Sequence, residues 1–111
     1  MSTPPEGVGR FSAEQRSEVR YRVEQPAMMR VLGAHVDVFL VTILDASRSG
    51  LRVSCPKGFA VGTQVEVSFA ALKLPGQVRY VRLVEAGTSH LGIQVAAGRE
   101  SELLRRLKLP A

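Results

Sequence analysis

The sequence predicts an all-β domain, a six-stranded antiparallel β-barrel followed by a C-terminal helix. Six short apolar or alternating segments follow one another closely with no long helical pattern between them, which favours a barrel or sandwich over a βαβ fold. Valine is concentrated between Val31 and Val95, a bias typical of strands. Closing the barrel would protect the strand edges of this valine-rich chain. The 111 residues suffice for one domain with one modest core.

The N-terminal segment differs in composition from the rest of the chain. Residues 1–10 are rich in proline, glycine and hydroxyl side chains, which predicts a flexible tail over 1–12 and a folded domain over 13–111. Ser12 and Gln15 have the spacing of a capping box, so we expect a short helical turn over 13–18. Such a turn is too short to be stable alone in water.

Strand character begins at Tyr21 and returns at regular intervals. In "GLRVSC", for example, apolar residues alternate with Arg52 and Ser54, so one face should be buried. The stretch "PKGFAVG" between Pro56 and Gly62 is turn material. The six expected strands are 26–33, 35–47, 50–55, 63–70, the part of 72–87 that follows Pro75 and Gly76, and 89–96.

The last segment, "GRESELLRRLKL", predicts the helix. Leu103, Leu104 and Leu107 have helical spacing, acidic residues come first and basic residues last, as the helix dipole favours. We expect the leucine face to cover part of the barrel. No internal repeat or second domain is evident.

The net charge of +5, with arginine outnumbering lysine, points to an anionic partner, because guanidinium groups suit phosphates and guanine edges. The alternative is an ordinary soluble protein with a high isoelectric point.

Several function classes find no support in the residues. Cys55 is the only cysteine, so we expect no disulfide and a small buried apolar role for this residue. His35 and His90 lie far apart in the sequence, so we expect no metal site, and we expect no cofactor. No catalytic constellation or phosphate-binding loop appears, so we expect no enzyme. The longest apolar run, "VDVFLVTIL", is far shorter than the about 20 residues that span a bilayer. We therefore expect a soluble, cytoplasmic protein without membrane insertion.

Two short stretches remain as candidates for binding. Arg16 and Arg20 lie four residues apart in "RSEVR" and could form a two-pronged cationic clamp, or simply be solvated. In "DASRSG", Asp45 and Ser47 precede Gly50 between two strands. A plain turn, with Gly50 at positive φ, would explain part of this pattern, but a turn alone does not need both Asp45 and Ser47.

Taken together, R-x-x-x-R followed by one or two strands and then D-x-S-x-x-G leading into "GLRV" resembles the PilZ domain family. "QRSEVRYRV", "VGTQVEVSF" and "HLGIQVA" resemble further family segments, so the resemblance covers roughly residues 14 to 107. It implies a small barrel with a C-terminal helix that binds the bacterial second messenger cyclic di-GMP. One departure is Gln15, which stands where many members have another basic residue.

The resemblance implies that Arg16, Arg20, Asp45, Ser47 and Gly50 bind the nucleotide. Arginines suit its phosphates and purine faces, and an ionised Asp45 suits the N1–H and amino group of guanine. Ser47 would contact a phosphate or a base, and Gly50 would let the backbone approach the ligand.

We expect the arginine segment to be mobile until it folds over the nucleotide, and that ordering to be read by a partner protein of unknown identity. His90, at the start of the last expected strand, is expected to be an exposed loop residue, with a lesser chance of reaching the ligand, and Arg48 is expected to be solvated.

Two alternatives are a basic small barrel that binds nucleic acid and a PilZ-like protein–protein adaptor without ligand. Few aromatic platforms argue against the first, and the intact motif residues argue against the second.

Overall fold

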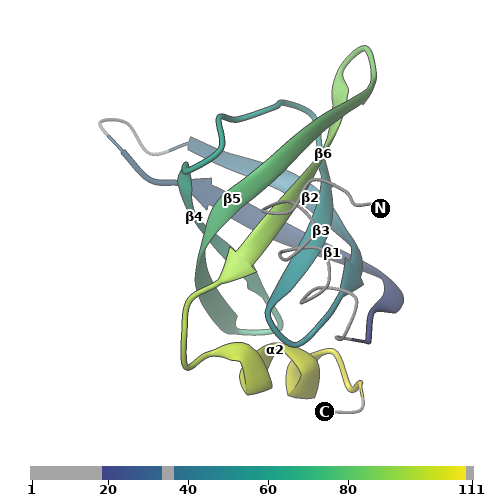
Figure 1. Ribbon diagram of the computed structural model, residues 1–111, viewed down its shortest axis with the longest axis vertical. Coiled ribbons are helices and arrows are strands. Elements are labelled where there is room, and N and C mark those ends of the chain that lie inside the picture. Colours follow the sequence, from purple (N-terminus) through teal and green to yellow (C-terminus); the bar gives the residue numbers. More distant parts are fainter. Residues whose placement is uncertain (1–18, 34–36, 110–111) are drawn as a thin grey trace, which may run out of the picture.

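The structure, a computed structural model, describes residues 19–33 and 37–109. They form a closed antiparallel barrel with a helix across one end (Figure 1), as the sequence predicts. The elements are β1 (Tyr21–Val31), β2 (Asp37–Ala46), β3 (Gly50–Cys55), β4 (Gln64–Phe69), β5 (Leu72–Glu85), β6 (Thr88–Val95) and α2 (Glu100–Arg106). The tail expected over 1–12 and the helical turn expected over 13–18 lie outside the described residues.

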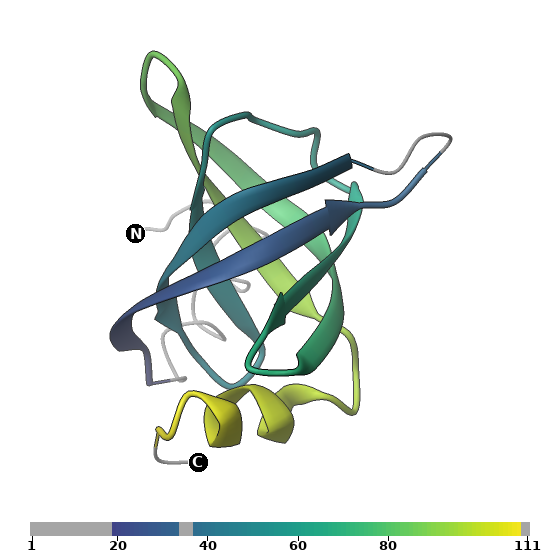
Figure 2. The ribbon, with the colours of Figure 1, turned by 180° about the vertical axis from the view of Figure 1, so that it is seen from behind.

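The strand order around the barrel is β1-β2-β3-β6-β5-β4, and β1 pairs with both β2 and β4 to close it. Seen from behind, β1 and β2 cross the barrel wall side by side (Figure 2). Closure gives every strand two neighbours and leaves no long unpaired edge, which the valine-rich strands require.

Side chains that alternate along each strand fill the interior. In β3, Leu51, Val53 and Cys55 are buried, and in β4 the buried residues are Val65 and Val67, followed by Phe69. Cys55 is thus a core residue, as expected, and burial raises the pKa of its thiol. The outward positions between these residues carry polar and charged side chains.

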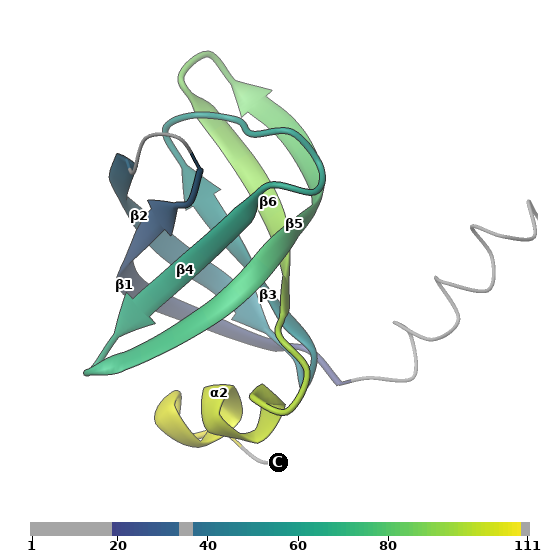
Figure 3. The same ribbon diagram turned by 90° about the vertical axis from the view of Figure 1, so that its left-hand side faces the viewer.

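Helix α2 lies across one end of the barrel (Figure 3). Leu103 and Leu104 are buried, and Leu107 packs against the core, so the leucine face covers the barrel end as predicted. Two arginine contacts join the helix region to the neighbouring sheet: Arg99 Nη2 donates to the carbonyl of Lys73 at the start of β5 at 3.0 Å, and Arg106 donates to the carbonyl of Ala70 between β4 and β5.

Strand β5 is longer than its sequence suggests. It starts at Leu72 and runs through Pro75 and Gly76, where the pattern favoured a strand only afterwards. Pro75 pairs with Glu66 of β4, and its carbonyl accepts a hydrogen bond from the Ala96 amide at 2.9 Å. The far end of β5 and the start of β6 form a hairpin that projects at the end of the molecule opposite α2 (Figure 1).

Candidate functional site

A β-bulge places Asp45 on the outer wall of the barrel. Ile43 pairs with Val53 and Asp45 with Arg52, so Leu44 is an extra residue in β2 relative to β3. Directly paired residues point to the same face of a sheet, and Arg52 lies between the inward Leu51 and Val53. Asp45 therefore points outward beside Arg52, although strict alternation from the buried Ile43 would turn it into the core.

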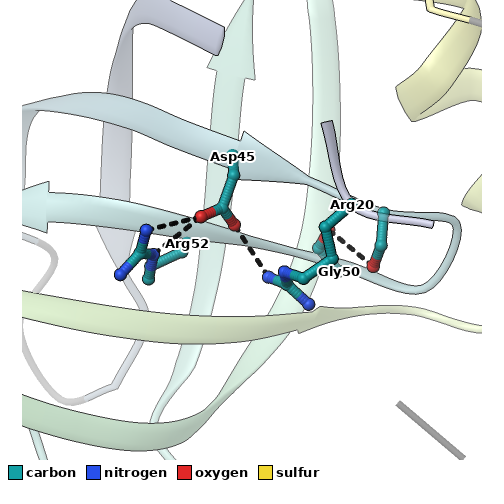
Figure 4. Close-up of polar contacts among 5 residues, drawn as sticks. Arg20, Asp45, Gly50 and Arg52 are labelled. Atoms are coloured by element: carbon teal, nitrogen blue, oxygen red, sulfur yellow. Dashed lines mark hydrogen bonds and ion pairs between the residues drawn. The ribbon is translucent and has the colours of Figure 1, made fainter. Parts of the chain in front are cut away.

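The carboxylate of Asp45 is held by two arginines (Figure 4). Arg20 Nη2 donates to Asp45 Oδ1 at 2.8 Å. Arg52 approaches the other oxygen, with Nε 2.8 Å and Nη2 2.6 Å from Oδ2. Residues from the segment before β1, from β2 and from β3 thus meet in one cluster.

The cluster is covered at its centre and open at its rim. The side chain of Asp45 is 9% exposed, whereas those of Arg20 and Arg52 are 40% and 32% exposed. Partial burial strengthens these charge-assisted hydrogen bonds relative to exposed ion pairs. Two guanidinium groups surround one carboxylate, so the cluster carries one net positive charge that faces solvent.

Further groups extend this charge over the neighbouring strands. The paired positions across the wall place Arg22, Asp45, Arg52, Gly92 and Tyr80 in one outward row. A Cβ at Gly92 would come within 2.0 Å of a Tyr80 ring carbon, so the tyrosine ring occupies the space above this glycine. In the next outward row, His90 of β6 pairs with Arg82 of β5. We call the outer surface of β2, β3, β5 and β6 around Arg20, Asp45, Arg52, His90 and Arg82 the basic face.

Ser47 serves the turn between β2 and β3. It is fully buried, its amide donates to the carbonyl of Gly50 at 2.8 Å, and its hydroxyl lies 3.4 Å from the same oxygen. The turn thereby fixes the position of the adjacent Asp45. Arg48, at the tip of the turn, is exposed as expected.

Gly50 is required for a reason other than the one expected. Its φ is not positive, so the prediction of a left-handed backbone here is wrong. Instead, a Cβ at this position would lie 2.4 Å from the carbonyl oxygen of Ile93 in β6. The absence of a side chain allows β3 and the turn to approach β6 closely, where the amide of Val95 also donates to the carbonyl of Ser49 at 2.8 Å.

Replacing Gly50 with alanine is expected to lower the free energy of unfolding by about 1–3 kcal/mol, because the added methyl group meets main-chain atoms that cannot rotate away. Urea denaturation measures this loss. Arg48→Ala, in the same turn, is the control and should change the free energy by less than about 0.5 kcal/mol. Equal stability of both variants would contradict the close approach of β3 to β6.

The structure adds two residues to the site. The sequence did not single out Arg52, and it predicted a loop position for His90. Arg52 read as an outward residue of a strand, and its pairing with Asp45 could have been found only by assuming the register of the β2–β3 hairpin. His90 lies within β6, not in the loop before it, and pairs with Ser54 on one side and Arg82 on the other. These pairings place His90 on the basic face.

Arg16 lies outside the described residues, so of the two predicted arginines only Arg20 is placed. Arg20, Asp45, Ser47 and Gly50 do lie together, since Asp45 binds Arg20 directly and Ser47 and Gly50 shape the turn that follows Asp45. Among residues 19–33 and 37–109, no helix is long and apolar enough to cross a membrane.

The fold and the basic face define a class of small β-barrel domains with an arginine-rich outer surface and a helix across one end. The family model of the PilZ domain matches residues 14–108. The chain belongs to the PilZ domain family, as the motifs suggested.

Comparison with solved structures supports the same fold. The structure of the K. pneumonia MrkH–c-di-GMP complex matches with a TM-score of 0.56 and 13% sequence identity over 81% of this chain. The match covers 51% of MrkH, so this chain spans about half the length of that protein. No curated protein matched the sequence.

Proposed function

We propose that this domain is a receptor for cyclic di-GMP that acts without catalysis. The observation that carries the proposal is the Asp45 carboxylate, which holds Arg20 and Arg52 at 2.8 Å or less on the outer wall of a PilZ barrel. The structural likeness to MrkH, a protein whose complex with c-di-GMP is known, supports the same ligand class.

The arginines supply the phosphate contacts. Each guanidinium is oriented by one edge toward Asp45 and retains further N–H groups, because the group carries five donors in a planar fork. Arg20 and Arg52 can therefore bind phosphate oxygens or stack on a purine while remaining bonded to the carboxylate. Arg16, four residues before Arg20, supplies the second prong of the clamp from the preceding segment.

Asp45 has a double role in this proposal. Its Oδ2 accepts from Arg52 through two nitrogens, whereas Oδ1 accepts one bond from Arg20. A carboxylate offers about four acceptor positions, so Oδ1 has capacity for a donor from guanine. Asp45 thus positions the arginines first and recognises N1–H or the amino group of guanine second. Ser47 and Gly50 act by fixing the turn that holds Asp45 in place.

Calorimetric titration with cyclic di-GMP, and with cyclic di-AMP as control, tests the proposal. Adenine has no N1–H and no 2-amino group, so it lacks the adjacent pair of donors that guanine offers to Asp45, and the guanine nucleotide should bind more tightly. Equal affinity for both nucleotides would remove the recognition role of Asp45, and no binding of either would refute the receptor function.

We further propose that nucleotide binding is transmitted to a partner protein. Arg20 stands at the junction between β1 and the preceding segment, so a nucleotide bound to Arg16 and Arg20 would order that segment and present it to a partner protein. Amide hydrogen exchange over residues 10–22 should slow when cyclic di-GMP is added, whereas exchange over β4 should remain unchanged and serves as the internal control. Equal exchange of residues 10–22 with and without nucleotide would refute this mode of transmission.

A further inference from the structure

His90 occupies an unusual position on the basic face. It lies between Ser54 of β3 and Arg82 of β5, one row along the wall from the Asp45–Arg52 pair. Its Nδ1 nitrogen is covered and finds no hydrogen-bond partner in the part of the chain that the structure describes. An unpaired covered nitrogen costs free energy.

The charges around His90 disfavour a proton on its ring. Burial lowers the pKa of His90 below its usual value, and Arg52 of β3 and Arg82 of β5 lower it further. Asp45 of β2 acts in the opposite sense but is the smallest of these influences. Tyr80 of β5 is the other titratable group nearby in the cross-strand rows. The imidazole is therefore neutral at pH 7.

An anion on the basic face would reverse this balance. A phosphate near Arg52 and Arg82 offsets the two positive charges that oppose protonation, and its oxygens are acceptors for an imidazolium N–H. The phosphodiester of a cyclic dinucleotide stays ionised over the pH range in which histidine titrates, so the ligand itself supplies no competing change in charge.

We propose that His90 is a further nucleotide-binding residue, which takes up a proton when a phosphate binds between Arg52 and Arg82. This inference rests on the proposed receptor function and adds a dependence on pH to it. Because the nucleotide-bound state holds the proton more strongly, the titration midpoint of His90 lies at higher pH with nucleotide than without it. Affinity for the nucleotide therefore rises as pH falls between these two midpoints and levels off below the lower one. Each unit by which the phosphate raises the midpoint allows at most about a tenfold gain in affinity.

The test is calorimetry with cyclic di-GMP at about pH 8, 7 and 6, in buffers of different ionisation enthalpy. We expect affinity to increase about three- to tenfold from pH 8 to pH 6, with uptake of up to about one proton per nucleotide. His90→Gln keeps a polar side chain but cannot titrate, so it should lose both effects. His35→Gln, which changes the other histidine of the chain, is the matched control and should keep them.

A second measurement follows the proton directly. The NMR titration midpoint of the His90 ring should move to higher pH when the protein is saturated with cyclic di-GMP, while that of His35 should stay in place. Binding without proton uptake, or the same pH dependence in His90→Gln, would overturn this inference and leave the receptor function standing. No binding at any of the three pH values would overturn both.

Discussion

Replacing Asp45 with asparagine is expected to weaken cyclic di-GMP binding by about one hundredfold. The carboxylate accepts charge-assisted bonds from both Arg20 and Arg52, and each such bond contributes about 1.5–3 kcal/mol. The amide keeps the size of the side chain but has one acceptor oxygen and no charge, so it cannot hold both guanidinium groups. Losing about 2.7 kcal/mol of binding free energy corresponds to this hundredfold change. Calorimetry with cyclic di-GMP measures the difference.

Asp37→Asn is the matched control for this variant. Asp37 is an exposed acidic residue at the other end of the same strand, β2, and the substitution removes the same charge. It should leave the affinity within about twofold, because only the long-range charge effect remains and salt screens it. A similar loss of affinity in both variants would mean that net charge, and not the Asp45 cluster, controls binding.

Replacing Arg20 with alanine is expected to weaken cyclic di-GMP binding by about ten- to one hundredfold. The variant loses one guanidinium that would contact the nucleotide, and it loses one of the two arginine partners of Asp45. Arg20→Lys should fall between the wild type and Arg20→Ala, because an ammonium group keeps the charge but cannot bind Asp45 and a phosphate through one planar fork.

Arg30→Ala controls for the loss of an arginine that is already paired with an acid. Arg30 lies near the other end of β1, where its Nη1 donates to Glu66 of β4 at 3.3 Å. This substitution should leave nucleotide binding unchanged within about twofold. If Arg20→Ala binds as well as Arg30→Ala, then Arg20 is a structural partner of Asp45 and does not bind the nucleotide.

The barrel and its helix could be predicted from the sequence because they follow from local patterns. Alternation in "GLRVSC" predicted β3, and the leucine spacing after Gly98 predicted α2. Strand β5 was the exception: Pro75 and Gly76 read as breakers, yet both are accommodated within the sheet. A Cβ at position 76 would lie 2.7 Å from the Gln94 carbonyl oxygen, so the glycine there serves the close approach of two strands.

The site was only partly predictable because its geometry depends on pairing between strands. The motif residues drew attention to Asp45 and the turn after it, but the bulge at Leu44 decides which face Asp45 occupies, and no local pattern marks it. Arg52 and His90 join the basic face through the registers of β3 with β2 and β6. A sequence read without those registers shows them as ordinary outward residues.

A map of backbone amide shifts in the NMR spectrum as cyclic di-GMP is added tests most directly whether the nucleotide binds at the basic face. We expect the largest changes to cluster at Arg20, in the turn from Asp45 to Gly50, and at Arg52 and His90 across the wall. The contrary result would be changes centred on the opposite wall, around Arg30 and Glu66 of β1 and β4, with the Asp45 turn unaffected.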